Sequence, residues 1–359
     1  MKKVSILFSL LAVLVLTGAS CVSFSSDSST TQGPAGMHIS TDRGDNWTQV
    51  SAWPTLEGVK NISGVSVYNV IGDPNDNRAM YLATREHGLF YTYDDAKSWQ
   101  RAEGPLSSGF VYNVAVHPTD KCIIYATTGS RVYRTADCSR TWQEVYRESR
   151  SDTRVVSIAF SYAAPFKVYV AESNGDLLQS YDASDSWNVL RRFKTRLVHV
   201  VTHPMDNNLI YVISKTNGLY RSNDSGSTWV GLSDKMSSFS GGTEYRRHII
   251  DPSNPNKIYW SSTYGILVSN TSGDSWENID LITPPGSADI YAFAVNPKNN
   301  NEIYYTATIN DRSTFYRSMD GGKNWVTKKL PSGQIPTMLR VHPDHADWIY
   351  LGFTIPPKK

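Results

Sequence analysis

Short stretches of alternating apolar and polar residues recur along most of this chain, separated by turns rich in Gly, Pro, Asn, Asp and Ser. One stretch, Val111 to Val116, leads into His117-Pro118, and another apolar stretch, around Tyr125, follows after a polar turn. Alternation with a period of two is typical of a half-buried β-strand. The pattern therefore predicts an all-β chain built from many short strands.

A tryptophan motif repeats seven times along the predicted strands. Each copy reads Ser or Thr, any residue, Asp, any residue, a small residue, any residue, Ser, Thr or Asn, and then Trp. The copies end at Trp47, Trp99, Trp142, Trp187, Trp229, Trp276 and Trp325. Successive tryptophans are 52, 43, 45, 42, 47 and 49 residues apart. A spacing of about 45 residues is typical of the four-stranded blades of a β-propeller.

A second repeat lies between the tryptophan motifs and supplies an independent count of the blades. An Asp, His or Asn precedes proline in six copies, and Ser161-Tyr162 is the degenerate seventh. A tyrosine then marks the following strand in each unit, at Tyr81, Tyr125, Tyr169, Tyr211, Tyr259, Tyr304 and Tyr350. The order predicts strands A and B around the proline turn, strand C before the tryptophan motif and strand D after it.

The two ends of the chain each supply half of one blade. The C-terminal unit contains strands A and B and ends near Tyr350, whereas the N-terminal unit begins with a C strand at Gly36 and continues past Trp47 as a D strand. Joining the two halves removes the exposed edges of both. The sequence therefore predicts a closed seven-bladed β-propeller over residues 36–359.

The tryptophan motif resembles the BNR or Asp-box repeat, and the resemblance covers residues 36 to 356. It also resembles photosystem II assembly factor-like and sortilin N-terminal-like propellers. The resemblance implies that the boxes are structural, with their aspartates closing turns and their tryptophans packing between blades. These aspartates are Asp42, Asp94, Asp137, Asp182, Asp224 and Asp320. Thr271 replaces Asp in one box, and small residues replace Gly in three, which predicts locally altered turns.

The N-terminal residues resemble a bacterial lipoprotein signal. Lys2 and Lys3 precede an apolar run of eleven residues, which is too short to span a bilayer as a mature helix. Small residues then precede Cys21, the predicted site of lipidation. We therefore predict a signal peptide at 1–20, a Ser/Thr-rich tether at 21–35, and an exported protein anchored by its lipid at the extracytoplasmic face of a bacterial membrane. An ordinary secretory signal is the alternative.

Composition and charge exclude several kinds of function. The chain has 35 basic and 33 acidic side chains, and removal of the predicted signal would leave the two numbers equal. This balance argues against nucleic-acid binding. The sequence contains no phosphate-binding loop, no nucleophile elbow and no cluster with metal-ligand spacing, so neither a metal nor a cofactor is predicted.

The catalytic alternatives come from the same resemblance. Sialidases need an arginine triad that this chain does not match, because Gln334 stands where their Arg-Ile-Pro motif has arginine. Xyloglucanase-like hydrolases use two carboxylates across a cleft between two propellers, and one propeller is predicted here. A pair such as Glu172 and Asp176 could act as acid and base. No catalytic residue is predicted, and a glycoside hydrolase remains the alternative to a non-catalytic propeller.

Basic side chains gather in the loops opposite the predicted boxes, and we interpret them as a docking surface. The residues are Arg147, Arg150, Arg154, Arg191, Arg192, Lys194, Arg196, Arg246 and Arg247. The predicted function is therefore a monomeric, non-catalytic scaffold that binds an acidic protein or an anionic glycan.

Cys122 and Cys138 fall in the same predicted blade, at one edge of adjacent strands. Export provides an oxidising setting, so a disulfide between them is predicted. Two free thiols are the alternative.

Overall fold

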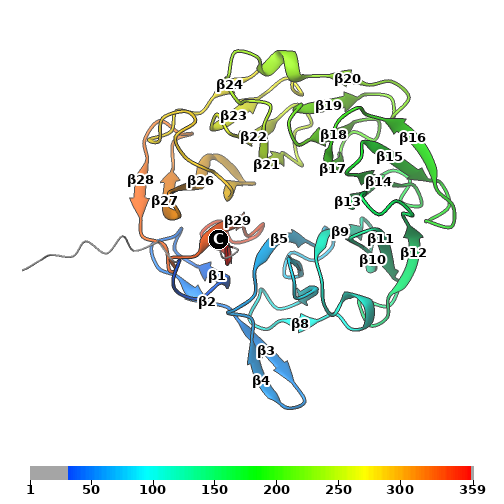
Figure 1. Cartoon of the computed structure of the whole chain (residues 1–359). Coiled ribbons are helices and arrows are strands. Elements are labelled where there is room, and N and C mark those ends of the chain that lie inside the picture. The colour runs from blue at the N-terminus through cyan, green and yellow to red at the C-terminus, as the bar shows by residue number, and fades with distance from the viewer. Residues whose placement is uncertain (1–30, 357–359) are drawn as a thin grey trace, which may run out of the picture. The chain divides into compact units, whose positions relative to one another are not determined.

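The computed structural model describes residues 31–356, which form a ring of seven four-stranded antiparallel sheets (Figure 1). Blade 1 contains β5 (Val67–Gly72), β6 (Met80–Thr84), β7 (Leu89–Thr92) and β8 (Gln100–Arg101). Blade 2 contains β9 (Val111–His117), β10 (Asp120–Thr128), β11 (Arg131–Thr135) and β12 (Gln143–Arg147). Blade 3 contains β13 (Val155–Phe160), β14 (Val168–Glu172), β15 (Asp176–Ser180) and β16 (Asn188–Arg192).

The remaining blades continue around the ring. Blade 4 contains β17 (Leu197–Thr202), β18 (Ile210–Ser214), β19 (Leu219–Ser222) and β20 (Val230–Gly231). Blade 5 contains β21 (Tyr245–Ile250), β22 (Ile258–Ser262), β23 (Ile266–Ser269) and β24 (Glu277–Asn278). Blade 6 contains β25 (Phe293–Asn296), β26 (Asn299–Ile309), β27 (Arg312–Ser318) and β28 (Val326–Lys328). Two short 3-10 helices, Gly104–Leu106 and Ser233–Met236, lie in loops.

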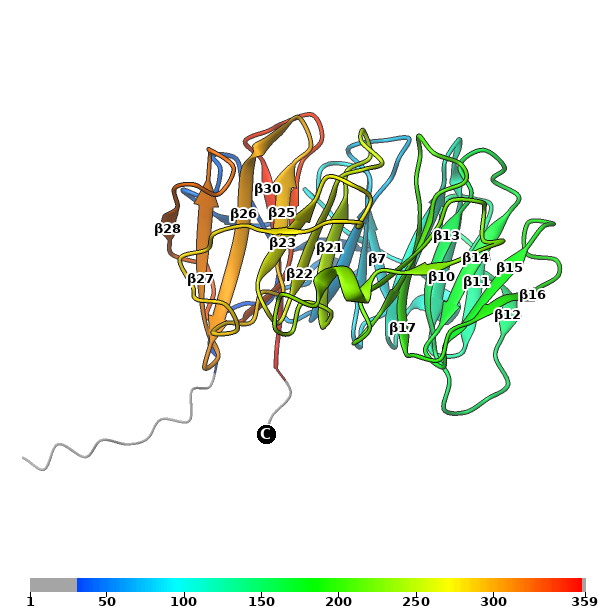
Figure 2. The same cartoon turned by 90° about the horizontal axis from the view of Figure 1, so that it is seen from above.

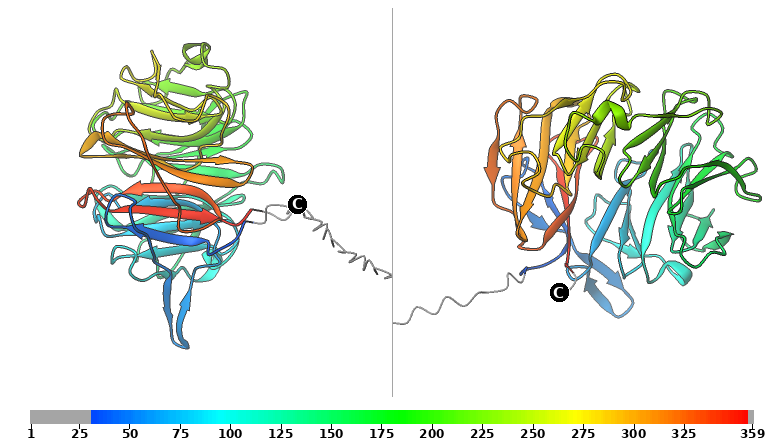
Figure 3. Two further views of the ribbon diagram at one scale, coloured as in Figure 1. Left: turned by 90° about the vertical axis from the view of Figure 1, so that its left-hand side faces the viewer. Right: turned by 45° about the horizontal axis from the view of Figure 1, so that its top comes forward.

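Blade 7 closes the ring in the predicted way. Its strands are β29 (Ile335–Val341), β30 (Ile349–Thr354), β1 (Gly36–Ser40) and β2 (Thr48–Gln49). β1 pairs antiparallel with β30 from Gly36 opposite Phe353 to Ser40 opposite Ile349. The views in Figures 2 and 3 show the resulting disc, in which the N-terminal and C-terminal strands lie side by side. The predicted seven-bladed fold and its closure are confirmed.

The core lies between adjacent blades, and the repeated aromatic residues fill it. The strand-B tyrosines are 0% to 3% exposed in all seven blades. Trp47 packs edge-on against Phe315 of blade 6 at 5.6 Å between ring centroids, and Trp99 is fully buried. Burial of such large rings between blades stabilises the ring, because apolar surface is removed from water.

The Asp box closes each C-to-D turn through a fixed set of hydrogen bonds. In blade 4, Asp224 Oδ1 accepts the Thr228 backbone N–H at 2.8 Å, and the Ser222 hydroxyl donates to the same carboxylate at 2.7 Å. Ser222 Oγ in turn accepts the Gly226 N–H at 2.8 Å. The Thr228 hydroxyl also donates to Asp224 Oδ2, and this bond, together with those from the Thr228 N–H and the Ser222 hydroxyl, lowers the pKa of Asp224 to about 2.

The prediction that the divergent boxes have altered turns is wrong. Ala96, Ser139 and Ser184 have φ of 67°, 70° and 81°, in the same left-handed region as the 88° to 95° of the glycines at this position. Thr271 Oγ1 accepts the Ser275 N–H at 2.8 Å, as an Asp oxygen does in the other boxes. The turn geometry is therefore kept by the hydrogen bonds rather than by glycine alone.

One element was not predicted. A hairpin of β3 (Ala52–Thr55) and β4 (Gly58–Asn61) projects from the ring edge between blade 7 and blade 1 (Figure 1). Its insertion accounts for the long spacing between the first two tryptophan motifs. Trp53 packs edge-on against Phe90 at 5.4 Å, whereas Leu56 at the tip is fully exposed.

Candidate functional site

A groove lies on the face opposite the Asp boxes, over blade 7. This blade has no hairpin joining strands B and C, because β30 ends at Thr354 and β1 begins at Gly36. The neighbouring blades retain their hairpins, so the surface is hollowed between them. The cavity has a volume of about 800 Å³, and Ile335, Thr337 and Ile355 lie along its floor.

The wall from blade 6 is the long hairpin of β26 and β27. The strands pair up to Ile309 opposite Arg312, and the two residues between them, Asn310 and Asp311, have φ of 50° and 61°. A two-residue turn with both φ values positive matches the twist of a hairpin, and Asn and Asp tolerate it well. This turn places the Asp311 side chain in the lining of the groove.

The wall from blade 1 is aromatic and charged. Tyr68 and Phe110 pack edge-on at 4.8 Å, and the Arg85 guanidinium lies 5.4 Å and 5.6 Å from their ring centres. Glu86 follows Arg85 in the turn between β6 and β7 and is exposed. Cation–π contact holds Arg85 against the rings, and Arg85, Glu86 and Phe110 line this wall of the groove.

The carboxylates of the groove differ in their partners. Asp289 pairs with Arg246 at 3.2 Å. Within residues 31–356, neither Glu86 nor Asp311 forms an ion pair, and the two lie on different walls. Two carboxylates on either side of a bound sugar, with an aromatic surface for its apolar face, are the elements that glycoside hydrolysis requires.

Four of the nine predicted basic side chains form ion pairs within the fold, at Arg147, Arg150, Arg192 and Arg246. Arg147 pairs with Glu144 at 2.6 Å, and Arg154 donates to the backbone carbonyls of Ser151 and Thr153. Arg192 lies 3.5 Å from Asp176. Arg191, Lys194 and Arg196 are exposed and form no ion pair among the residues that the structure describes, so their partner-binding role stays a prediction.

Arg150 covers a cluster of three buried carboxylates. Its guanidinium contacts Glu148 at 2.7 Å, Glu172 at 2.8 Å and Asp176 at 3.0 Å. Burial raises the pKa of Glu172 to about 8, whereas the Arg150 hydrogen bonds lower the pKa of Glu148 to about 2. Glu172 is completely buried and also accepts the Tyr146 hydroxyl at 2.8 Å. A substrate cannot reach it, so the considered acid–base pair of Glu172 and Asp176 is a structural ion network instead.

Arg246 lies beside the groove, and Arg247 lies at the centre of the ring. Arg246 pairs with Asp289, as described above. Arg247 donates to the backbone carbonyls of Tyr68, Tyr291 and Thr337, which belong to other blades, so it joins the blades around the channel.

The cysteine predictions fall in two parts of the chain. Cys122 and Cys138 are bonded in the structure, between the start of β10 and the box that follows β11. Cys21 lies outside the described residues. Within residues 31–356 no helix is long and apolar enough to cross a membrane, and no His, Cys, Asp and Glu side chains gather in a metal-binding group.

Comparison with known proteins finds a matching family model and several propellers of similar fold. Residues 35–172 match the family model described as Sortilin-Vps10, neurotensin receptor 3. The solved xyloglucanase of Xanthomonas campestris superposes with a TM-score of 0.64 at 16% identity, over 90% of this chain and 53% of that one. YCF48 from Cyanidioschyzon merolae superposes with a TM-score of 0.60 at 14% identity, over 81% and 96%. The resemblance to Asp-box, sortilin-like and assembly-factor-like propellers is confirmed.

The curated relatives point to glycan hydrolysis. A xyloglucanase of a Paenibacillus species is 26% identical over 67% of this chain and 23% of its own length. Xyloglucanase Xgh74A of Acetivibrio thermocellus is 26% identical over 64% of this chain and 27% of its own length. This chain thus spans about a quarter of the relatives it matches. The prediction of a non-catalytic scaffold is wrong, because these relatives are named as hydrolases.

The groove residues were missed at the sequence level. Glu86, Phe110 and Asp311 come from three different connections, and none belongs to a repeated motif. The signal that was present is Asn310-Asp311 between two apolar strands, which predicts a tight hairpin but not what the hairpin faces.

Proposed function

We propose that this chain binds and hydrolyses a β-linked glucan of the xyloglucan class in the groove over blade 7. The observation that carries the proposal is the placement of Glu86 and Asp311 in the lining of one cavity of about 800 Å³, on turns of blades 1 and 6, where neither forms an ion pair within the described residues. The similarity to proteins named xyloglucanases over about two thirds of this chain supports the substrate class.

The groove offers a separate role to each kind of side chain. One carboxyl group protonates the departing glycosidic oxygen, and the other acts on the opposite side of the sugar as base or nucleophile. Phe110 provides the aromatic part of the lining, and the apolar C–H groups of a sugar pack against aromatic side chains. Asp289, held by Arg246, and Asn310 line the same cavity and can hydrogen-bond sugar hydroxyls.

Hydrolysis of defined glucans tests this proposal. Xyloglucan, mixed-linkage β-glucan and a sialoside are each incubated with the full chain, and new reducing ends or free sialic acid are measured. We expect product from xyloglucan, and a loss of 10²- to 10⁴-fold in kcat for Glu86→Gln or Asp311→Asn, which is the usual contribution of a general acid or base.

Asp152→Asn is the matched control for these variants, because it removes an exposed loop carboxylate outside the groove. It is expected to retain the wild-type rate. The proposal would be overturned by product formation that neither groove substitution changes, or by wild-type protein that releases no product from any glucan.

Export and anchoring form a second part of the proposal. A polysaccharide is too large to enter a cell intact, so a hydrolase for it must act outside, in agreement with the signal predicted at residues 1–20. We place the lipid on Cys21. Cys21→Ala should move the protein from the membrane fraction to the soluble fraction after detergent-free lysis, and unchanged membrane association would contradict this assignment.

A further inference from the structure

The centre of the ring contains a second, polar cavity that is distinct from the groove. It has a volume of about 340 Å³ and is lined by the innermost strands of blades 1 to 5. The lining reaches Pro74 and Pro118, where strand A ends on the side of the Asp boxes. At the other end, Arg247 joins blade 5 to blades 1, 6 and 7. The cavity is therefore approached from the face opposite the groove.

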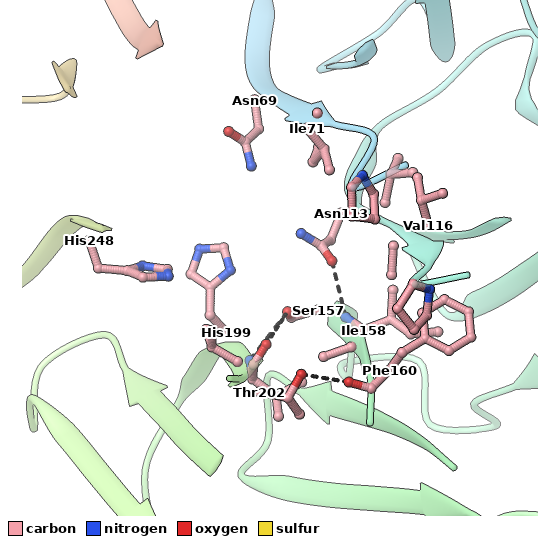
Figure 4. Close-up of a pocket in the computed structure, with 18 of the residues that line it drawn as sticks. Asn69, Ile71, Asn113, Val116, Ser157, Ile158, Phe160, His199, Thr202 and His248 are labelled. Carbon is pink, nitrogen blue, oxygen red and sulfur yellow. Dashed lines mark hydrogen bonds between the residues drawn. The ribbon is translucent and has the colours of Figure 1, made fainter. Parts of the chain in front are cut away.

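One repeat position supplies the polar lining. The residue four positions before the strand-A corner is Asn69, Asn113, Ser157, His199 and Arg247 in blades 1 to 5. The pairing of strands A and B is irregular beside this residue in each of these blades. A bulge of this kind turns a side chain out of the regular alternation. Figure 4 shows Asn69, Asn113 and His199 directed toward a common space.

The two asparagines present their amide N–H groups to the cavity. Asn113 Oδ1 accepts the Ile158 backbone N–H at 3.2 Å (Figure 4). Asn69 Oδ1 accepts the Val70 N–H at 3.0 Å. Arg247 Nη1 also donates to Asn69 Oδ1 at 3.4 Å. Since the oxygens are occupied, the orientation of both amides is fixed. Their NH₂ groups have no acceptor among residues 31–356, so they are free to bind a ligand.

His199 is a buried side chain of this cavity that has no hydrogen-bond partner within residues 31–356. Its side chain is 8% exposed and makes no hydrogen bond within the described part of the chain. Its ring centroid lies 5.1 Å from that of His248, whose Nδ1 is engaged by the Tyr245 hydroxyl at 2.9 Å. An imidazole buried without a hydrogen bond is costly unless a ligand or water supplies one.

The charges around the cavity favour an anion. No Asp or Glu lines it, whereas Arg247 borders one end. Arg340 lies against Gly72, a lining residue, closely enough that a Cβ on Gly72 would collide with the guanidinium. Arg340 forms no ion pair within residues 31–356. A cation would meet two guanidinium groups here, and an anion would be stabilised by both.

We propose that this channel cavity is a binding site for a small oxyanion of the phosphate or sulfate class. The amide groups of Asn69 and Asn113 and the imidazole of His199 donate to its oxygens, and Arg247 and Arg340 supply the positive potential. This site is independent of the proposed hydrolysis, because it shares no lining residue with the groove.

Titration of the purified chain with inorganic phosphate and with sodium sulfate tests the site, using chloride at equal ionic strength as the reference. Calorimetry should show saturable binding of about one oxyanion per chain. Asn113→Asp keeps the oxygen that accepts from Ile158 but adds a negative charge, and it should weaken binding by at least tenfold. Asn217→Asp adds the same charge on an exposed turn and should leave binding unchanged.

A spectroscopic measurement keeps the proposal testable if Asn113→Asp fails to fold. The ring signals of His199 and His248 are followed in wild-type protein by NMR, with His199→Gln for assignment, and they should shift saturably with phosphate. Absence of any shift or heat beyond the chloride reference would overturn the proposal. Equal affinity in Asn113→Asp and wild type would do the same.

Discussion

The two faces of this propeller differ in how regular their connecting turns are. On the Asp-box face, every C-to-D turn has left-handed φ values at the fourth and fifth positions of the box. The turn N–H groups are bonded by a hydroxyl and a carboxylate, and where Thr271 replaces Asp its hydroxyl oxygen takes the place of the carboxylate. On the opposite face, each connection differs in length and composition, and the groove combines residues from blades 6, 7 and 1. The first face is specified by local sequence and maintains the ring, whereas the second is free to vary and holds the candidate site.

Replacing one glycine on each face by alanine should give the largest difference in stability between the two faces. Gly44 in the first box has φ of 88°, and a Cβ there would lie 2.5 Å from Phe315 Cε1. Gly44→Ala therefore combines backbone strain with overpacking and should lower the free energy of unfolding by about 2–4 kcal/mol. Urea denaturation followed by tryptophan fluorescence measures the change.

Gly286 is the matched position on the opposite face. Its φ is 74°, but no atom lies within 4 Å of an added Cβ. Gly286→Ala should therefore cost only the backbone strain, about 1 kcal/mol. If Gly44→Ala and Gly286→Ala lowered the free energy of unfolding equally, the box turn would not be more tightly packed than the loops opposite it.

The Arg150 cluster makes the stability of the opposite face depend on pH. The pKa of Glu172 is about 8 in the folded protein and near its ordinary value of 4.5 in the unfolded chain. The protonated form therefore stabilises the fold below about pH 4.5, and this contribution is lost as the pH rises through 8. Glu172→Gln mimics the protonated form, so the variant should lose less stability than wild type between pH 5 and pH 9, by about 1–3 kcal/mol.

Unfolding free energies of both proteins at pH 5, 7 and 9 provide this measurement. The difference between them cancels the contributions of groups that titrate in common. Parallel pH profiles would contradict the assignment of a protonated Glu172.

Loss of one box carboxylate should have a smaller effect. Asp94 accepts the Ser98 backbone N–H at 3.0 Å and the Thr92 and Ser98 hydroxyls at 2.7 Å. Asp94→Ala leaves these donors to water and should lower the free energy of unfolding by about 1 kcal/mol. Asp152→Ala on the opposite face should change it by less than about 0.5 kcal/mol. Thermal melts of both variants would contradict the account if the order were reversed.

The sequence predicted the box face in much greater detail than the face with the candidate site. Periodic positions such as Tyr350 recur in every blade, and the strand-B tyrosines are buried in all seven, as the repeat predicts. The box tryptophans recur as well, but Trp99 and Trp276 are buried whereas the other five are half-buried. Glu86 and Asp311 have no repeated counterpart, and they line one cavity because the ring closes through blade 7. Arg247 shows the same limit, because it was assigned to a surface patch on charge alone. In the structure, Arg247 instead donates hydrogen bonds to backbone carbonyl groups of three other blades.

Locating the glucan on the protein tests the central proposal most directly. Hydrogen exchange of Glu86→Gln is measured by mass spectrometry with and without a xyloglucan oligosaccharide. We predict slower exchange in the segments that form the groove walls, at residues 308–312 and 108–112, and no change in the box at residues 222–229. Protection confined to the box face or to the β3–β4 hairpin, with the groove unchanged, would contradict the account.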